Sequence, residues 1–149
     1  MTEVLFYHLE RQPLERVLPQ LIGKTLERGW RAVIQAGSEE RVEALSAALW
    51  VTGEESFLPH GTARDGNADL QPVWITEADD NPNGANIRFL VDGAKAGDMT
   101  AFDRVVFLFD GRDAEAVQNA RAAWKDFLRA GHTVTYWRED AQGRWQKQA

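Results

Sequence analysis

Residues 104–109 (RVVFLF) restrict the fold more than any other segment, because five of the six side chains are apolar. A strand that is apolar at consecutive positions has both faces buried, which is typical of a central strand in a parallel sheet covered by helices. The rest of the chain alternates short apolar runs with stretches of helical periodicity, the pattern that such a sheet needs. The sequence therefore predicts an α/β protein with a mostly parallel sheet.

The first half of the chain reads as strand, helix, strand and helix. Residues 3–9 and 31–36 are short strand-like runs, and residues 13–28 have apolar positions at helical spacing. Ser38 is suited to cap a second helix. The predicted apolar face of that helix comprises Val42, Leu45, Leu49 and Trp50. This order implies parallel strands joined by right-handed crossovers.

The second half continues the pattern with more loop. Strand-like runs are predicted at residues 73–76, 87–91, 104–109 and 132–137. A long helix over residues 113–130 has acidic residues in its first turns and Gly131 as its stop. We predict a single Rossmann-like domain over residues 1–137 with helices flanking the sheet. A polar tail over residues 138–149 follows, with Trp145 exposed.

Composition limits the cellular setting. A chain of 149 residues is long enough for one core and short for two. It contains no cysteine, so neither disulfides nor thiolate metal sites are possible, and a reducing cytoplasm is the expected location. The apolar runs are too short to span a membrane, and the N-terminus does not have the pattern of an export signal.

The charge balance argues against a polyanionic partner. Seventeen basic and 23 acidic residues give a formal net charge of -6, which repels nucleic acid on average. Direct DNA binding is therefore not expected. A small cationic patch on such a protein suits an acidic peptide better than a long nucleic acid. The alternative, stacking of single-stranded bases on some of the six tryptophans, stays open.

Motifs for catalysis or cofactors are weak. Residues 23–25 (GKT) resemble the end of a phosphate-binding loop, but Leu18 stands where a glycine is needed, and the triplet falls inside a predicted helix. His8, His60 and His132 have no metal-ligand spacing. We therefore expect no cofactor, no metal and no catalytic residue. A small phosphate- or nucleotide-using enzyme remains the alternative class.

The long helix carries a candidate binding site. Arg121, Trp124 and Lys125 stand at i, i+3 and i+4, so two cations and an indole are predicted to share one face. Such a face suits an acidic peptide that ends in an aromatic residue. The alternative is a solvated helix surface on which Trp124 only covers the edge of the core.

Several segments together resemble one known family. Residues 48–50 (ALW) and 55–60 (ESFLPH) are the most specific, together with an Arg-x-x-aromatic-Lys pattern in the last helix. A Gly-Trp-Arg triplet at residues 29–31 follows the same layout. The chain is similar over residues 3–137 to the chi subunits of the bacterial DNA polymerase III clamp-loader complex.

The resemblance implies a Rossmann-like sheet without nucleotide and a non-catalytic adaptor. In that family the acidic C-terminal peptide of the single-stranded-DNA-binding protein, which ends in Pro-Phe, binds at positions that correspond to Trp50, Arg121, Trp124 and Lys125. The psi subunit, or an equivalent clamp-loader component, is implied to contact Phe57. This chain departs from the pattern at Trp124, where tyrosine is common, and in its polar tail.

Overall fold

The computed structural model describes residues 2–51, 60–63, 65–95, 97, 99 and 101–149, with only the backbone described at residues 50 and 51. Its elements form one seven-stranded sheet in the order β3-β2-β4-β5-β1-β6-β7. All strand pairs are parallel except β6 with β7. In chain order the elements are β1 (Glu3–Leu9), α1 (Leu14–Glu27), β2 (Ala32–Gln35), α2 (Glu39–Val51), the 3₁₀ helix η1 (Ala68–Leu70), β3 (Val73–Thr76), β4 (Ile87–Leu90), β5 (Arg104–Asp110), α3 (Ala114–Arg129), β6 (Thr133–Glu139) and β7 (Trp145–Lys147). The predicted Rossmann-like α/β fold is confirmed.

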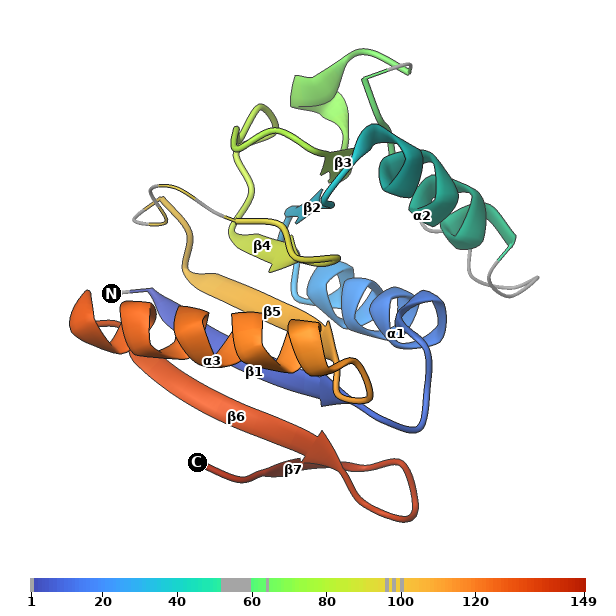
Figure 1. Cartoon of the computed structure of the whole chain (residues 1–149). Helices are drawn as coiled ribbons and strands as arrows, with labels where there is room; N and C mark the ends of the chain where they lie inside the picture. Colours follow the sequence, from blue (N-terminus) through green and yellow to red (C-terminus); the bar gives the residue numbers. More distant parts are fainter. Residues whose placement is uncertain (1, 52–59, 64, 96, 98, 100) are drawn as a thin grey trace.

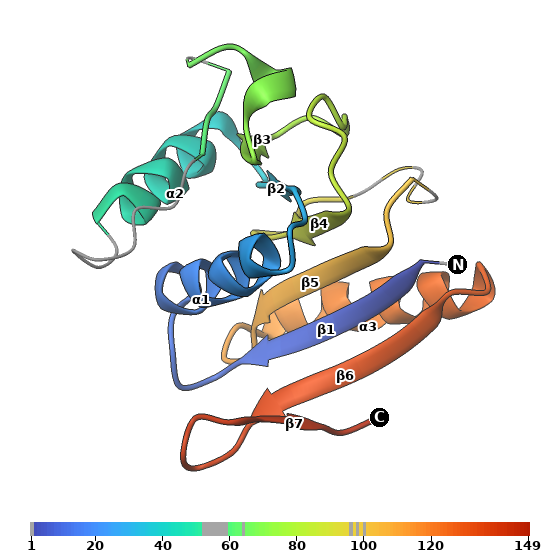
Figure 2. The ribbon, with the colours of Figure 1, turned by 180° about the vertical axis from the view of Figure 1, so that it is seen from behind.

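The helices are divided between the two faces of the sheet. The chain moves from β1 through α1 and α2 toward the β3 edge, but from β5 through α3 toward the β7 edge. Right-handed crossovers in opposite directions place their helices on opposite faces. Accordingly, Leu5 of β1 packs in one core cluster with residues of α1 and α2, whereas Phe6 packs in another with residues of α3. Figure 1 shows α3 in front of the sheet, and Figure 2 shows α1 in front.

Local sequence signals fix α3. The Asp113 carboxylate accepts hydrogen bonds from the backbone N–H groups of Glu115 at 3.0 Å and Ala116 at 3.4 Å, which satisfies two donors of the first turn. Gly131 ends the helix with a φ of 86°, in the left-handed region that glycine adopts without strain. Ala120 faces the sheet and is fully buried. The helix therefore lies within the range that the sequence predicted.

A buried arginine, Arg88, connects β4 to β2 and to the loop after β3 on the face of the sheet that α3 covers only in part. Arg88 of β4 is 1% exposed, and its guanidinium donates to Gln35 Oε1 at 2.8 and 2.5 Å. It also donates to the carbonyl oxygens of Ala78 at 2.8 Å and Asp80 at 2.7 Å. Because a buried cation must be fully hydrogen-bonded, these contacts hold the loop between β3 and β4 against the sheet.

Residues 138–149, predicted as a polar tail, contribute the end of β6 and the whole of β7. The two strands pair antiparallel, with Glu139 opposite Trp145. Trp145 stacks on Tyr7 with ring centroids 4.6 Å apart, so it is half-buried rather than exposed. The hairpin forms because Trp145 gains this apolar contact when it folds back over β1. Within the part of the chain that the structure describes, no helix is both long enough and apolar enough to cross a membrane.

Candidate functional site

The predicted site residues of α3 divide between the surface and the sheet. Arg121 and Lys125 are exposed, whereas Trp124 is half-buried. The Trp124 ring meets Phe6 edge-on at a centroid distance of 5.4 Å and Tyr136 at 6.1 Å. The structure thus places the three residues on one flank of α3, with the indole reaching under the helix and the cations outside. The Trp124 ring therefore covers the edge of the core, as the alternative interpretation of the sequence predicted.

The cations line a shallow hollow on the outer surface of α3. Its volume is about 390 Å³, and it is lined by Gln118, Arg121, Ala122, Lys125, Asp126 and Arg129. Arg129 pairs with Asp126 at 3.7 Å. Among the described residues, neither Arg121 nor Lys125 has a carboxylate partner. The hollow therefore has two positive charges available for an anionic ligand.

Apolar side chains border these cations. Leu128 follows Trp124 by one turn and is 50% exposed, one of two large hydrophobic side chains with high exposure in the described structure. On the neighbouring strand β6, Val134 and Tyr136 are half-buried and pack against the core cluster that also contains Phe6 and contacts Trp124. An aromatic or aliphatic group of a ligand can pack here while its carboxylates meet the cations. We call Arg121, Trp124, Lys125, Leu128 and Tyr136 together the α3 flank.

Tyr136 is held in place by a polar chain from β1. His8 Nδ1 is hydrogen-bonded to the Tyr136 hydroxyl, and His8 Nε2 lies 2.9 Å from Glu10 Oε1. Glu10 also pairs with Arg138. Burial lowers the pKa of His8, with Arg138 acting in the same direction and Glu10 opposing it. Burial raises the pKa of Tyr136, while the charges of Arg138 and Arg121 oppose that shift.

Sequence reasoning did not single out Leu128 or Tyr136. Leu128 stands four residues after Trp124, a helical spacing that was available in the sequence. Tyr136 comes near Trp124 only because β6 pairs with β1 in a register that sets Phe6 opposite Tyr136. Across the described residues, no group of three or more His, Asp or Glu side chains is arranged to hold a metal ion.

The helix that carries Trp50 lies apart from this group, and Phe57 is not among the described residues. Trp50 is near the end of α2, and α2 packs on the opposite face of the sheet from α3. Its side chain and the whole of Phe57 lie outside the described residues. The structure therefore brings together Arg121, Trp124 and Lys125, and it places the helix of Trp50 on the other face.

A second region, the crevice, lies at the carboxyl ends of β1 and β5. Here α1 and α3 leave toward opposite faces, which is the position where open α/β sheets bind nucleotides. The crevice has a volume of about 530 Å³. Its charged lining residues are the acids Glu15, Asp92, Asp110, Asp113 and Glu115 and the bases Arg41 and Arg112.

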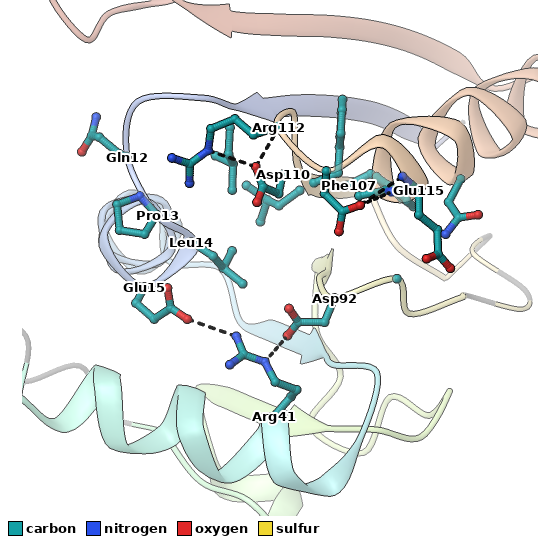
Figure 3. Close-up of a pocket in the computed structure, with 17 residues that line it drawn as sticks. Gln12, Pro13, Leu14, Glu15, Arg41, Asp92, Phe107, Asp110, Arg112 and Glu115 are labelled. Carbon is teal, nitrogen blue, oxygen red and sulfur yellow. Dashed lines mark hydrogen bonds and ion pairs between the residues drawn. The ribbon is translucent and has the colours of Figure 1, made fainter.

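The crevice neutralises its own cations. Arg41 donates to Asp92 Oδ2 at 2.8 Å and to Glu15 Oε1 at 3.1 Å, and Arg112 Nε lies 3.5 Å from Asp110 Oδ1, as Figure 3 shows. The first amides of α3 are occupied by the Asp113 side chain. A phosphate placed here meets an excess of carboxylates and few free donors, so the crevice fits a nucleotide poorly.

Comparison with known proteins adds independent findings. The family model described as "DNA polymerase III chi subunit, HolC" matches residues 1–135. The chain is also similar to the "Probable DNA polymerase III subunit chi" of Rickettsia prowazekii (strain Madrid E), with 28% identity over 91 residues. That match covers 61% of this chain and 55% of the relative, so it spans little more than half of the relative's length.

Proposed function

Given that the chain belongs to the family of DNA polymerase III chi subunits, whose model matches residues 1–135, we propose that it is a cytoplasmic, non-catalytic adaptor of the clamp-loader complex. The family itself supports a role in DNA replication. In this proposal, the α3 flank binds the acidic C-terminal peptide of the single-stranded-DNA-binding protein. The adaptor thereby connects the polymerase holoenzyme to DNA that this protein coats.

The observation that carries the proposal is the pair of available cations beside an apolar patch. The Arg121 guanidinium presents a planar fork that can hold a terminal carboxylate through two parallel hydrogen bonds. Lys125, one residue beyond Trp124 on the exposed surface, supplies a point charge for an acidic side chain. The terminal phenylalanine of the peptide packs against Leu128 and Tyr136. These groups match a peptide that combines acids with a C-terminal aromatic residue.

The second partner in the proposal is the psi subunit, or an equivalent clamp-loader component, with Phe57 as a contact. The α2 helix leads directly into residues 52–59 and lies on the opposite face from α3. The resemblance assigned Trp50 to the peptide site. Its helix, α2, lies on the opposite face of the sheet from the α3 flank. Measuring the affinity of Trp50→Ala for each partner decides which surface it serves.

Two other function classes have less support. A nucleotide- or phosphate-using enzyme needs an anion site. Five carboxylates line the crevice, and they repel an anion. A direct single-stranded-DNA binder needs a positive surface along the nucleic acid, whereas this chain has a formal net charge of -6. Both classes predict ligands that differ from an acidic peptide, so one titration series separates them.

The test is calorimetric titration of the protein with an acidic peptide ending in Asp-Ile-Pro-Phe, with bare oligothymidine and with ATP. We expect binding of the peptide alone, and weaker binding of a control peptide whose terminal carboxylate is amidated. Binding of oligothymidine or ATP without binding of the peptide would contradict the proposal.

A further inference from the structure

A separate groove lies on the face of the sheet opposite the α3 flank. It has a volume of about 430 Å³ and runs beside the last turns of α1 toward β6 and β7. Its floor is formed by four buried apolar side chains from three strands, Leu5, Ile87, Phe89 and Val106. Its aromatic wall consists of Tyr7, Trp30, Trp137 and Trp145. We call it the tryptophan groove. Trp137 and Trp145 lie beyond residues 1–135, the part that the family model matches.

Available positive charge borders this groove. Lys24 in the last turn of α1 and Arg28 just after the helix are exposed, and neither forms an ion pair among the described residues. The exposed Glu27 between them also lines the groove, so the cations exceed the acid there by one unpaired charge. The Arg28 guanidinium lies over the Trp30 ring, 3.9 Å from its centroid. That contact uses the flat face of the guanidinium and leaves its N–H donors free for a carboxylate. A third cation, Arg104, is already paired with Glu3 at 3.0 Å.

The aromatic rings are packed against one another rather than open for stacking. Tyr7 stacks on Trp145 with a 15° interplanar angle and meets Trp137 edge-on at 6.3 Å. One face of Trp30 is covered by Arg28. A nucleobase needs an open ring face and partners for its polar edges, and the floor of this groove is apolar. An apolar side chain flanked by carboxylates matches both the half-buried rings of Trp30 and Trp145 and the two cations, Lys24 and Arg28.

We propose that the tryptophan groove is a second docking site, which takes an internal acidic segment of a partner protein. A phenylalanine or leucine of that segment packs against the half-buried rings of Trp30 and Trp145, and its neighbouring carboxylates contact Lys24 and Arg28. The groove requires no free C-terminus, which distinguishes its ligand from the peptide proposed for the α3 flank. The two sites lie on opposite faces, so they can be occupied together.

The test uses protein labelled with 5-fluorotryptophan and fluorine NMR, with the signals assigned by single Trp→Phe variants. The probe is the capped peptide acetyl-Asp-Glu-Phe-Asp-Asp-amide, and a matched probe has serine in place of phenylalanine. We expect the phenylalanine probe to shift the signals of Trp30 and Trp145, to leave Trp124 unchanged, and to bind more tightly than the serine probe. The Trp124 signal reports separately on the α3 flank, so failure at one site is distinguishable from failure at the other.

Charge variants complete the test. The double variant Lys24→Gln with Arg28→Gln should weaken probe binding about fivefold to tenfold, the effect of removing two exposed charge contacts. The matched control, Arg11→Gln with Arg16→Gln, removes two exposed cations that do not line the groove and should bind like the parent. Unshifted Trp30 and Trp145 signals, or larger shifts with oligothymidine than with the peptide, would overturn the proposal. Equal weakening in the control variant would also overturn it.

Discussion

The crevice at the carboxyl ends of β1 and β5 and the α3 flank both carry cations. The cations of the crevice are paired with carboxylates, and the two cations of the flank are not. In the crevice, Arg41 contacts two carboxylates and Arg112 contacts one. On the flank, neither Arg121 nor Lys125 has a carboxylate partner in the described part of the chain. A cation that is already paired attracts a ligand weakly, whereas an unpaired cation forms new charge-assisted contacts.

Because of this difference, the unpaired cations do not lie at the position where this fold usually binds its ligand. The sheet topology creates a crevice where related architectures bind nucleotides, and this chain fills that crevice with Glu15, Asp92 and Asp113. The cations without a carboxylate partner, Arg121 and Lys125 among the described residues, lie instead on the outer side of α3. Fold alone therefore suggests a nucleotide, whereas the pairing state of individual side chains supports the acidic peptide that we propose.

The largest expected effect is on peptide affinity when the flank loses its guanidinium. Arg121→Ala should weaken binding of the Asp-Ile-Pro-Phe peptide by about 1.5–3 kcal/mol, the range for a hydrogen bond to a charged group. Its melting temperature should stay the same, because Arg121 is exposed and its removal opens no cavity. Calorimetric titration and a melting curve measure both quantities.

The matched control for this change is Arg41→Ala in the crevice. It removes an equally long cationic side chain whose partners are Glu15 and Asp92, and it should leave peptide affinity unchanged. If Arg41→Ala weakened the peptide as much as Arg121→Ala, the contrast between the two regions would be lost.

A smaller effect is expected on stability when the cap of α3 is removed. Asp113→Ala frees the amides of Glu115 and Ala116, which should lower the free energy of unfolding by about 1 kcal/mol. Peptide affinity should change little, because Asp113 lies at the crevice end of α3. Denaturant unfolding checks this, with Asp113→Ser as the control that keeps a capping oxygen. An uncapped variant as stable as the parent would show that the cap contributes nothing.

Lys125→Ala should have a smaller effect on affinity than Arg121→Ala, about 0.2–1 kcal/mol, because an exposed ammonium gives a single screened contact. For the same reason, the dissociation constant of the parent should rise with ionic strength. Titrations at low and high sodium chloride concentration measure this dependence. Binding that is insensitive to salt would assign the affinity to Trp124, Leu128 and Tyr136 alone.

The smallest expected effect concerns pH and His8, which joins the two regions by contacting Tyr136 and facing Asp110. Its pKa is lowered in the folded protein from the ordinary value of 6.5, chiefly by burial. The unfolded chain therefore takes up this proton at a higher pH than the folded protein. The contribution to stability is complete above pH 6.5 and is lost as the pH falls from 6.5 through the lowered folded pKa.

Melting curves from pH 8 to pH 5 test this sign, with His8→Gln as the variant that lacks the titrating group. The parent should lose more stability over this range than His8→Gln does. A parent that gained stability relative to the variant as the pH fell would show that the contacts with Glu10 and Asp110 outweigh burial.

The fold could be predicted largely from local patterns. The apolar run at β5 indicated a central strand, and the helical spacing before Gly29 and Gly131 located α1 and α3 within a few residues. The hairpin of β6 and β7 could not be predicted, because β7 is a short polar strand whose main apolar contact is Trp145 on Tyr7. Contacts between residues that are distant in the sequence leave no local pattern.

The candidate site could be predicted only in part, for a geometric reason. Spacing placed Arg121, Trp124 and Lys125 on one side of a helix, but it did not reveal that the indole packs on Phe6 while the cations face solvent. Tyr136 was missed because its approach to Trp124 depends on the pairing of β6 with β1. The self-neutralised crevice was also missed, since Arg41 and its partners come from three distant segments.

Photocrosslinking locates the bound peptide on the α3 flank or in the crevice. The terminal phenylalanine of the Asp-Ile-Pro-Phe peptide is replaced by benzoylphenylalanine, the complex is irradiated, and the modified residues are identified by mass spectrometry. We expect crosslinks to Trp124, Leu128 and Tyr136, and their loss in Arg121→Ala. Crosslinks confined to the crevice, for example at Leu14 or Phe107, would contradict it.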